Sequence, residues 1–414
     1  MTTALYVTFG ALAGLAVLLL VSTELSKRLD ISLSGRLFLT CFLGFGVFGL
    51  AIKAGILASL QEDRTLVAWA EAGRGEKAPA AHASTDLTRF GLTFPARGRE
   101  WRALPAASGV ENPVLVDLGR RLFSDPRLSA DGTVACASCH DLAKGGDDGR
   151  ATSRGVHGQV GSRNAPSVLN APFLRRLFWD GRAKTLEEQA TGPLLNPIEM
   201  GLSSGDQAVK VVLADPSYRS GFAQAGFPVN LNTITRAIAA FERSLAPGET
   251  AYDRFVGGDD TALSDRQLRG MVLFDEIGCR RCHPDPWFSA AAEPTASPYR
   301  IFPVFREAPL VQRFGLAEDG GRNGSHVWRV PSLRNVGLTA PYFHNGAVDR
   351  LEDAVRVMVQ AQLNRKIEPD EGARIQVERK PGGGVRVLGR RYLTEADVAD
   401  ITAFLHALSE PGVF

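Results

Sequence analysis

Cysteine and histidine occur together in a short pattern that the chain carries twice. The pattern is Cys-x-x-Cys-His, and its copies are Cys136, Cys139 and His140, and Cys279, Cys282 and His283. Two thiols at this spacing can bond to the two vinyl groups of one porphyrin while the following histidine binds the iron, which is the chemistry of c-type haem attachment. The sequence therefore predicts two covalently bound c-type haems, with both histidines as axial iron ligands.

Paired cysteines also occur in zinc sites and in thioredoxin-like redox pairs. A zinc site needs four ligands, and neither kind of site explains a histidine directly after both pairs. The two copies use four of the five cysteines in the chain. We therefore favour haem over these alternatives. The fifth cysteine, Cys41, lies in an apolar stretch, where an inert buried thiol is expected.

Length and charge restrict the class of protein. The chain has 414 residues, which leaves room for two or three domains. Its net charge of +2 offers no basic field for nucleic acid. The 44% hydrophobic content is ordinary for a globular protein that carries a short membrane segment.

Two apolar runs near the N-terminus are each long enough to cross a bilayer as a helix. They extend from Ala4 to Ser22 and from Leu37 to Leu60. Three basic residues lie between them, so the positive-inside rule places the connecting loop in the cytoplasm. We predict a transmembrane hairpin over residues 1–61 in a bacterial inner membrane, with the remainder in the periplasm, where c-type haem is attached. A cleaved signal peptide is the weaker alternative, because no Lys or Arg precedes the first run.

The remaining chain predicts a tether followed by compact helices. Residues 62–109 are rich in Ala, Gly, Arg and Pro, which favours a linker. Capping signals and apolar spacing then predict a mainly α soluble part. The expected helices cover 113–123, a segment opened by Thr185, 232–245, a segment opened by Ser264, and 394–408. Residues 374–388, within an insertion spanning 362–392, predict a short β-hairpin.

The order of motifs from Asn112 to Glu410 resembles the bacterial dihaem cytochrome c peroxidase family. Besides the first haem motif, the matching segments are LFSDPRLS (122–129), RNAPS (163–167), FWDGR (178–182), GPLLNPIEM (192–200) and LTAPYFHNG (338–346). The resemblance implies two tandem cytochrome c-like domains, a peroxidatic one over 110–250 and an electron-transfer one over 251–414. The predicted hairpin in the membrane, residues 284–327 and the insertion fall outside it.

Each haem needs a candidate for its sixth ligand. For the second haem this is Met358, fourteen residues after His344, because a methionine ligand raises the potential of the iron and suits a haem that accepts electrons. Ordinary core packing is the alternative. For the first haem, His157 stands where the family carries a reversible distal ligand, between two glycines that allow a loop to move. A surface histidine in a flexible loop is the alternative.

The resemblance also assigns residues to catalysis and to a metal ion. Glu199 matches the carboxylate that takes a proton from peroxide and returns it to the leaving oxygen, and Gln189 would position peroxide or a water. Trp179 matches an aromatic residue between the two haems, where it can shorten the electron path. The alternative for Glu199 is a solvated charge in a loop, and the alternative for Trp179 is a tryptophan packed in the core. The residues matching an interdomain calcium site, which would bind through oxygen atoms, are Asn164, Thr339 and Pro341.

The family implies reduction of hydrogen peroxide to water with electrons from a small cytochrome c, a cupredoxin or a membrane donor. Two alternatives are a dihaem electron-transfer subunit of a membrane respiratory complex, without peroxidase activity, and a haem oxidase that modifies a partner. Glu199, Gln189 and His157 favour the peroxidase over the carrier. Met358 disfavours the oxidase, because the related enzyme that matures the methylamine dehydrogenase cofactor has a tyrosine there. Pairing of two chains, as in relatives, is left open.

Overall fold

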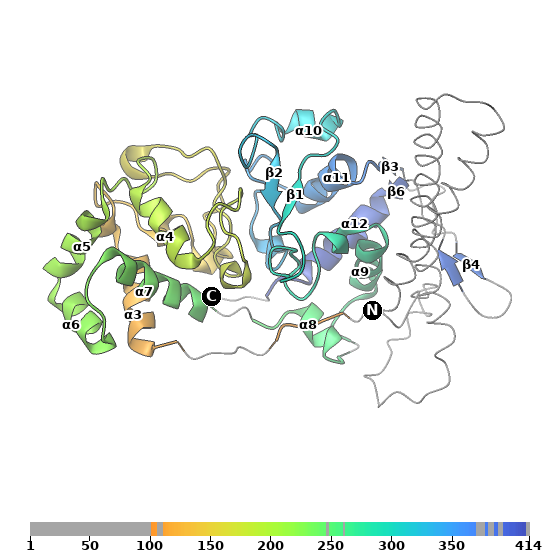
Figure 1. The fold of residues 1–414 in the computed structure, drawn as a ribbon. Coiled ribbons are helices and arrows are strands. Elements are labelled where there is room, and N and C mark those ends of the chain that lie inside the picture. Colours follow the sequence, from red (N-terminus) through yellow and green to blue (C-terminus); the bar gives the residue numbers. More distant parts are fainter. Residues whose placement is uncertain are drawn as a thin grey trace, which may run out of the picture. The chain divides into compact units, whose positions relative to one another are not determined.

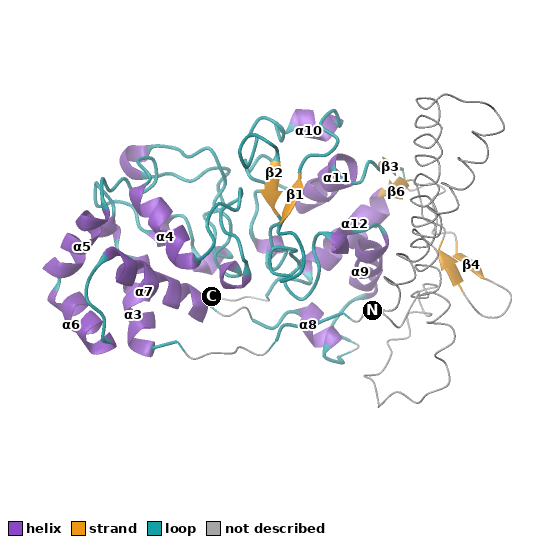
Figure 2. Ribbon diagram, viewed as in Figure 1, coloured by secondary structure: helices purple, strands orange, loops and turns teal. Residues whose placement is uncertain are grey.

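Helices joined by long loops make up most of the described chain, and its strands are short (Figures 1 and 2). The computed structural model describes residues 101–105, 111–245, 248–259, 261–369, 377–379, 385–387 and 392–410, all within one structural unit. Both apolar runs predicted to span a membrane, and most of the predicted tether, lie outside these residues. Within the described ranges no helix has the length and apolar character needed to cross a bilayer. The prediction of a mainly α fold is confirmed.

One hydrophobic core lies among the helices of residues 111–245. These helices are α3 (Pro113–Phe123), α4 (Leu186–Leu195), α5 (Gly205–Ala214), α6 (Pro216–Ala225) and α7 (Leu231–Ser244). α3 begins at a proline, which suits the first position of a helix because no backbone N–H is needed there. The Asn112 side chain caps the helix by accepting hydrogen bonds from the Val114 and Leu115 amides. α3 crosses α7 closely at Gly119, where a Cβ atom would lie 1.9 Å from the carbonyl oxygen of Ala237. This crossing brings the apolar faces of both helices into the core.

A second core lies among the helices of residues 248–410. These helices are α8 (Ala251–Val256), α9 (Asp265–Glu276), α10 (Pro309–Arg313), α11 (Leu351–Ala361) and α12 (Glu395–His406). α9 and α12 repeat the crossing of α3 and α7, since a Cβ atom at Gly270 would lie 1.9 Å from the carbonyl oxygen of Asp400. Ser264 caps α9 together with Gln267, as predicted. α9 then leads directly into the second haem motif.

The strands form three pairs. β1 (Tyr299–Ile301) and β2 (Val327–Arg329) are antiparallel, β3 (Lys366–Glu368) and β6 (Tyr392–Thr394) are parallel, and β4 (Val377–Arg379) and β5 (Val385–Val387) are antiparallel. The last pair is the hairpin predicted in the insertion. The first pair matters for the site, because it carries Arg300, Trp328 and Arg329 to the cavity described below.

Residues 101 and 104, near the end of the predicted tether, contact the second core. The Trp101 ring lies 6.0 Å from that of Tyr252 and 6.1 Å from that of Phe404, and the guanidinium of Arg280 lies 3.9 Å from its centre. The Leu104 amide donates a hydrogen bond to the Asp253 carboxylate. The composition of this segment, rich in Ala, Gly and Pro, gave no signal of these contacts, because their partners lie far along the chain.

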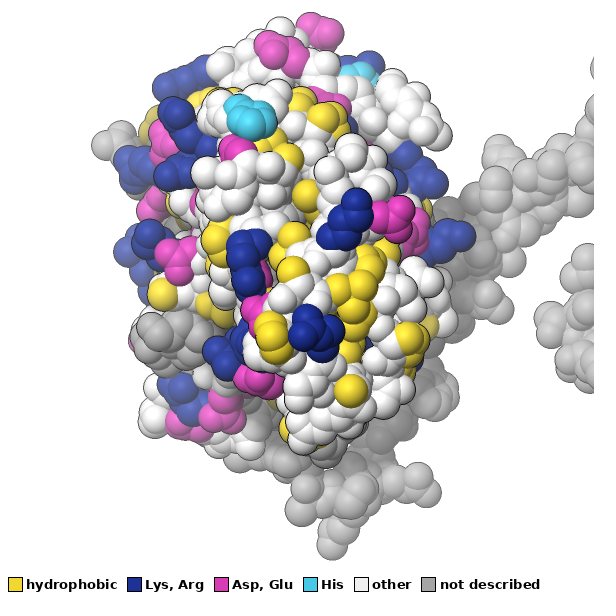
Figure 3. Space-filling view, turned by 90° about the vertical axis from the view of Figure 1, so that its left-hand side faces the viewer, with side chains coloured by type: hydrophobic (Ala, Val, Ile, Leu, Met, Phe, Trp, Pro, Cys, Tyr) yellow, Lys and Arg dark blue, Asp and Glu magenta, His cyan; other side chains and the backbone are white. Residues whose placement is uncertain are grey.

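Charged side chains of both signs are interspersed on the face of the molecule that Figure 3 shows, with apolar side chains between them. No field of a single sign covers this face.

Candidate haem centres

The first haem motif forms a tight turn that fixes its histidine. Residues Cys136–Ser138 form a short 3-10 helix, and the His140 amide donates a hydrogen bond to the Cys136 carbonyl oxygen. The His140 Nδ1 atom lies 3.1 Å from the carbonyl oxygen of Gly146, so Nδ1–H is the donor and Nε2 is the nitrogen suited to an iron. Burial lowers the pKa of His140. The ring is therefore neutral, as a metal ligand must be.

The second haem motif repeats this geometry. Residues Cys279–Arg281 form the 3-10 turn, and His283 Nδ1 lies 3.0 Å from the carbonyl oxygen of Phe288. Burial lowers the pKa of His283 to about 4. Burial also raises the pKa of the Cys279 thiol to about 12, so this sulfur environment disfavours a thiolate and is compatible with an uncharged thioether. In both motifs a main-chain carbonyl oxygen therefore fixes Nδ1 of a buried histidine and leaves Nε2 for the iron.

A large cavity opens beside the second motif. It holds about 1770 Å³ of space not filled by protein atoms, including its mouth toward solvent. Its lining includes Cys279, Cys282 and His283 from the motif, Met358 from α11, and apolar side chains such as Leu405. The structure therefore brings the predicted methionine to the same cavity as the attachment motif. Thiols, a neutral histidine and a thioether around an apolar space fit a c-type haem.

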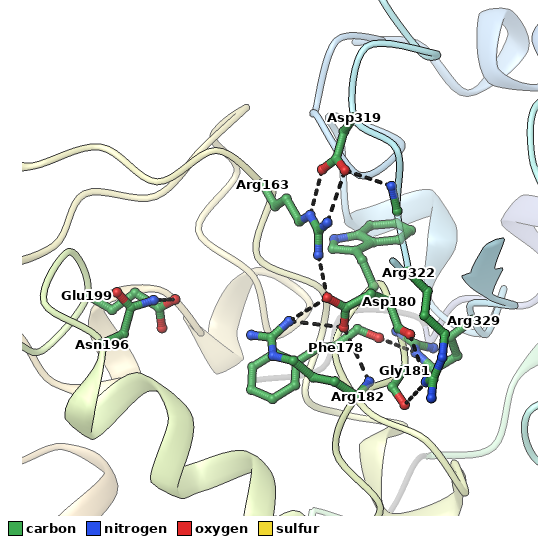
Figure 4. A network of polar contacts seen from close by, with 12 residues as sticks. Arg163, Phe178, Asp180, Gly181, Arg182, Asn196, Glu199, Asp319, Arg322 and Arg329 are labelled. Carbon is green, nitrogen blue, oxygen red and sulfur yellow. Dashed lines mark hydrogen bonds and ion pairs between the residues drawn. The ribbon is translucent and has the colours of Figure 1, made fainter. Parts of the chain in front are cut away.

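Glu199 lies near the first motif, in the loop that follows α4. Asn196 Nδ2 donates a hydrogen bond of 2.7 Å to Glu199 Oε1, as Figure 4 shows. Burial raises the pKa of Glu199, while this hydrogen bond and the charge of Arg182 partly offset the rise. Burial also raises the pKa of the Cys139 thiol, and the charges of Asp148 and Glu199 add to this rise. Glu199 is thus a partly buried acid beside the first haem motif.

Two neighbouring segments shape the surroundings of Glu199. Gly155 packs so closely that a Cβ atom there would lie 1.8 Å from the Ile198 carbonyl oxygen, and the Val156 amide donates to the Glu199 carbonyl oxygen. Gln189 lies on α4 and is half-buried. Among the described contacts no hydrogen bond joins Gln189 to Glu199. The structure therefore confirms no polar link between these two predicted partners.

His157 points into solvent in this structure. Its side chain is 67% exposed, and its Nδ1 atom lies 3.5 Å from Asp131 Oδ2. Its amide donates a hydrogen bond of 2.7 Å to the same oxygen. The preceding Val156 is buried instead. The predicted distal ligand is therefore held outward by Asp131, with a left-handed backbone at His157 (φ 56°).

The residues predicted for the electron path and for calcium lie at the cavity beside the second haem motif. Trp179, Asn164, Thr339 and Pro341 all line it. The Trp179 indole N–H donates a hydrogen bond of 2.9 Å to the Asn164 carbonyl oxygen, which ties two of these predicted residues together.

Asp147 is a residue of this region that the sequence reasoning missed. It is 1% exposed and lines the same cavity, and neither of its carboxylate oxygens has a hydrogen-bond partner. Burial raises its pKa to about 6, and the nearby Gly149 backbone offsets this only in part. Its one signal in the sequence is the pair of consecutive aspartates after two glycines. Asn164, Thr339 and Pro341 line the same cavity, and carboxylate and carbonyl oxygens are the ligands that a hard cation prefers.

A network of arginines and aspartates joins the two halves of the chain (Figure 4). Arg163 donates two hydrogen bonds to Asp319, at 2.7 and 3.0 Å, and a third of 2.8 Å to Asp180. Arg182 also pairs with Asp180 at 3.0 Å. Asp180 directly follows Trp179, so the network fixes the segment that carries the tryptophan.

Known proteins share this sequence and fold. The sequence pattern of a family described as "Di-haem cytochrome c peroxidase" matches residues 113–261. Cytochrome c551 peroxidase of Nitrosomonas europaea is 41% identical over 267 residues, which cover 64% of this chain and 78% of the relative. Cytochrome c551 peroxidase of Pseudomonas aeruginosa is 38% identical over 300 residues, which cover 71% and 78%.

A solved structure has the same fold. The crystal structure of a MauG-like protein associated with microbial copper homeostasis is 30% identical and superposes with a TM-score of 0.58, covering 74% of this chain and 95% of that chain.

Proposed function

The chain belongs to the di-haem cytochrome c peroxidase family, and on this premise we propose how it reduces hydrogen peroxide with electrons from a cytochrome c. Its activity is that of a cytochrome c peroxidase. The observation that supports our assignment of roles is the partly buried carboxyl group of Glu199 beside the first haem motif. We propose that the first motif carries the peroxidatic haem and the second the electron-accepting haem, within domains 110–250 and 251–414.

Glu199 is the proposed acid and base. A haem held by Cys136, Cys139 and His140 would supply the iron chemistry that reduces peroxide. Cleavage of the O–O bond needs a group that removes a proton from one oxygen and delivers it to the leaving oxygen. A carboxyl group with a raised pKa can hold that proton between the two transfers, and Asn196 fixes its orientation. Gln189, on the helix that leads to this loop, is proposed to position peroxide or a water.

Electrons are proposed to enter at the second haem, between His283 and Met358. The Met358 side chain lines the cavity beside His283, which supports its assignment as the second axial ligand. Trp179 lines the same cavity and is fixed by its hydrogen bond to Asn164. We propose that its ring shortens the electron path toward the first motif. The donor is a small cytochrome c, with a cupredoxin or a membrane donor as alternatives.

We infer that the outward position of His157 is the form that admits peroxide. Its exposure and its contacts with Asp131 would leave the ring in solvent when a haem is held at the first motif. A turn of the loop between the glycines on either side would be needed for His157 to bind iron.

We also propose that a calcium ion binds in the cavity beside the second haem motif. Asn164, Thr339 and Pro341 would supply neutral oxygen ligands. The unpartnered carboxylate of Asp147 would supply the negative charge, because a buried carboxylate without a hydrogen bond is costly unless a cation neutralises it. The membrane hairpin, the periplasmic location and the pairing of chains remain proposals that rest on the sequence.

The test is to mix half-reduced protein with hydrogen peroxide and reduced cytochrome c, and to follow the haem spectrum and donor oxidation. Glu199→Ala should lower kcat/KM by roughly a hundred- to ten-thousandfold while both haems stay attached. Asp206→Ala, which removes an exposed carboxylate at the start of α5, is the control and should keep full turnover. A fully active Glu199→Ala variant would refute the assigned role. Haems that exchange electrons but ignore peroxide would identify an electron-transfer subunit.

A further inference from the structure

Arg329 is a buried cation that no carboxylate of the described chain neutralises. It ends β2 and is 3% exposed. Its Nε atom donates a hydrogen bond of 2.9 Å to the Phe178 carbonyl oxygen, and Nη1 lies 3.4 Å from the Val330 carbonyl oxygen. Figure 4 shows the guanidinium beside the segment from Phe178 to Arg182. Its hydrogen bonds therefore go to neutral main-chain oxygens.

The nearest acid does not balance this charge. Asp180 is the acid that acts on Arg329 electrostatically, but its carboxylate pairs with Arg163 at 2.8 Å and with Arg182 at 3.0 Å. Burial lowers the pKa of Arg329 to about 10, so the guanidinium is still charged at neutral pH. An isolated buried charge is strongly unfavourable unless an opposite charge or further hydrogen bonds compensate for it. An anion that is not part of the described chain would remove this cost.

The position of Arg329 indicates which anion this is. Arg329 lines the cavity that also contains Cys279, Cys282 and His283. His344 lines the same cavity, is 2% exposed, and has a buried Nε2 atom without a hydrogen-bond partner. Its ring is fixed by stacking on Trp328, with ring centres 4.1 Å apart. A buried cation and a buried imidazole nitrogen thus face one space.

The other ionisable groups of the cavity leave this pair available. Arg334 forms an ion pair with Asp253, in which Nη1 lies 2.5 Å from Oδ2. Arg300 donates to the main-chain oxygens of Ser297 and Tyr299, and Tyr342 is also part of the lining. Asp147 is the unpartnered carboxylate of the cavity, and no ion pair joins it to Arg329 within the described residues. The cavity therefore presents an uncompensated cation to whatever fills it.

We propose that Arg329 binds a propionate carboxylate of the haem attached at Cys279 and Cys282, with His344 Nε2 as a second partner. This inference rests on the two haems of the proposed function. The propionates are the anionic groups of a haem at neutral pH, and a guanidinium binds a carboxylate through two parallel hydrogen bonds. The Arg329 amide also donates a hydrogen bond of 2.9 Å to the Trp179 carbonyl oxygen. One residue thus joins the electron-accepting haem to the segment that carries the tryptophan.

Arg329 should also raise the potential of this haem. An oxidised haem carries one more positive charge than a reduced one, so a fixed cation in a low-dielectric site favours the reduced form. Pairing with Arg329 keeps the propionate ionised across neutral pH. Both effects are properties of the bound haem that do not depend on peroxide turnover.

The experiment is a potentiometric titration of the full chain with both haems attached, at several values between pH 5 and 8. Arg329→Gln should lower the midpoint potential of the second haem and make it depend on pH, because the propionate can then take up a proton. Arg329→Lys keeps the charge and should keep the potential. Arg322→Gln is the matched control. Arg322 donates to the carbonyl oxygens of Asp180 and Gly181 in the same segment, but it does not line the cavity.

Resonance Raman spectra provide a second measurement that does not depend on the Arg329→Gln variant folding. The propionate bending band of the second haem should shift in Arg329→Lys, which replaces two parallel hydrogen bonds by a point charge. An unchanged band in Arg329→Lys, or an unchanged potential in Arg329→Gln, in protein that retains both haems and peroxidase turnover would overturn the inference and leave the proposed function intact. A wild-type chain without attached haem would overturn the proposed function itself.

Discussion

Asp131 holds His157 by two atoms, because Asp131 Oδ2 accepts a hydrogen bond from the His157 amide and lies 3.5 Å from its Nδ1 atom. The same carboxylate also accepts hydrogen bonds from the amide and hydroxyl of Thr133. These contacts, the Thr133 hydroxyl foremost, lower the pKa of Asp131 to about 2. Because the lowered pKa keeps the Asp131 carboxylate charged above about pH 2, its contacts with His157 persist at neutral pH. They are lost only as the pH falls toward 2.

Asp131→Ala should release the His157 loop. With the acceptor removed, His157 can turn inward, so we expect the six-coordinate low-spin fraction of the oxidised first haem to rise severalfold. Electron paramagnetic resonance of the resting protein measures this fraction. The double variant Asp131→Ala with His157→Ala is the control and should stay high-spin. If the single variant stays high-spin as well, His157 is a surface residue and not a distal ligand.

Asn196→Asp should change the pH dependence of turnover. The aspartate keeps an acceptor for the Ile198 amide, which Asn196 Oδ1 binds at 3.0 Å, but it replaces the donor to Glu199 by a second negative charge. The pKa of Glu199, already raised by burial, should rise further. Glu199 must be ionised to accept the first proton, so the acid limb of kcat/KM should move to higher pH while the plateau is retained. An unmoved acid limb would show that another group limits the rate at low pH.

Met358→His should lower the potential of the second haem. Replacing a thioether ligand by an imidazole removes the ligand that favours the reduced iron, and the near-infrared band typical of methionine-ligated ferric haem should disappear. Met271→Leu is the control, because Met271 is 4% exposed in the core and its replacement keeps a similar volume. A near-infrared band that persists in the Met358 variant would return Met358 to core packing.

Asp147→Asn should have opposite effects on stability with and without calcium. In chelator-treated protein the variant should melt at a higher temperature, because a buried charge without a partner has been removed. With calcium present it should bind the ion at least about tenfold more weakly, since affinity follows the charge of the ligands. Calorimetric titration and thermal unfolding measure the two effects. Asp206→Asn, at an exposed position at the start of α5, should leave the calcium affinity unchanged.

The pKa of Asp147 leads to a related expectation for the wild-type protein. Its folded-state pKa is raised to about 6, above the ordinary aspartate value, so folding favours the protonated form. Without calcium, stability should therefore fall as the pH rises from about 4 to about 6 and then level off. Thermal unfolding in chelator across this range should show the decline, and the Asp147→Asn variant should not. A flat wild-type profile would mean that the carboxylate is solvated or paired.

Local signals in the sequence predicted the elements of the fold well. The helix expected over 232–245 is α7 (Leu231–Ser244), and the one expected over 394–408 is α12 (Glu395–His406), with Thr394 as its cap. Capping and apolar spacing act within one or two turns of chain, so they can be read without tertiary structure. The two haem motifs are equally local, because five consecutive residues carry both attachment points and a ligand.

The features that the sequence did not predict depend on segments far apart in the chain. Asp147 is buried because the loop before it packs on Leu338 and Thr339, which a Cβ atom at Gly145 would meet at 3.0 and 3.2 Å. Arg329 differs from other arginines only in where its strand places it. The outward turn of His157 depends on Asp131, twenty-six residues earlier. Charge, burial and orientation at these positions are set by tertiary contacts, for which the residue types alone give no signal.

The docking of Trp101 makes the first haem unit an insertion. Residues 101 and 104 contact the same core as residues 252, 253 and 404, and residues 111–245 are threaded between these contacts. During synthesis from the N-terminus, the first core can therefore form early. The contact of Trp101 with Phe404 can form only after Phe404 has been synthesised. The first unit is then held at both of its ends.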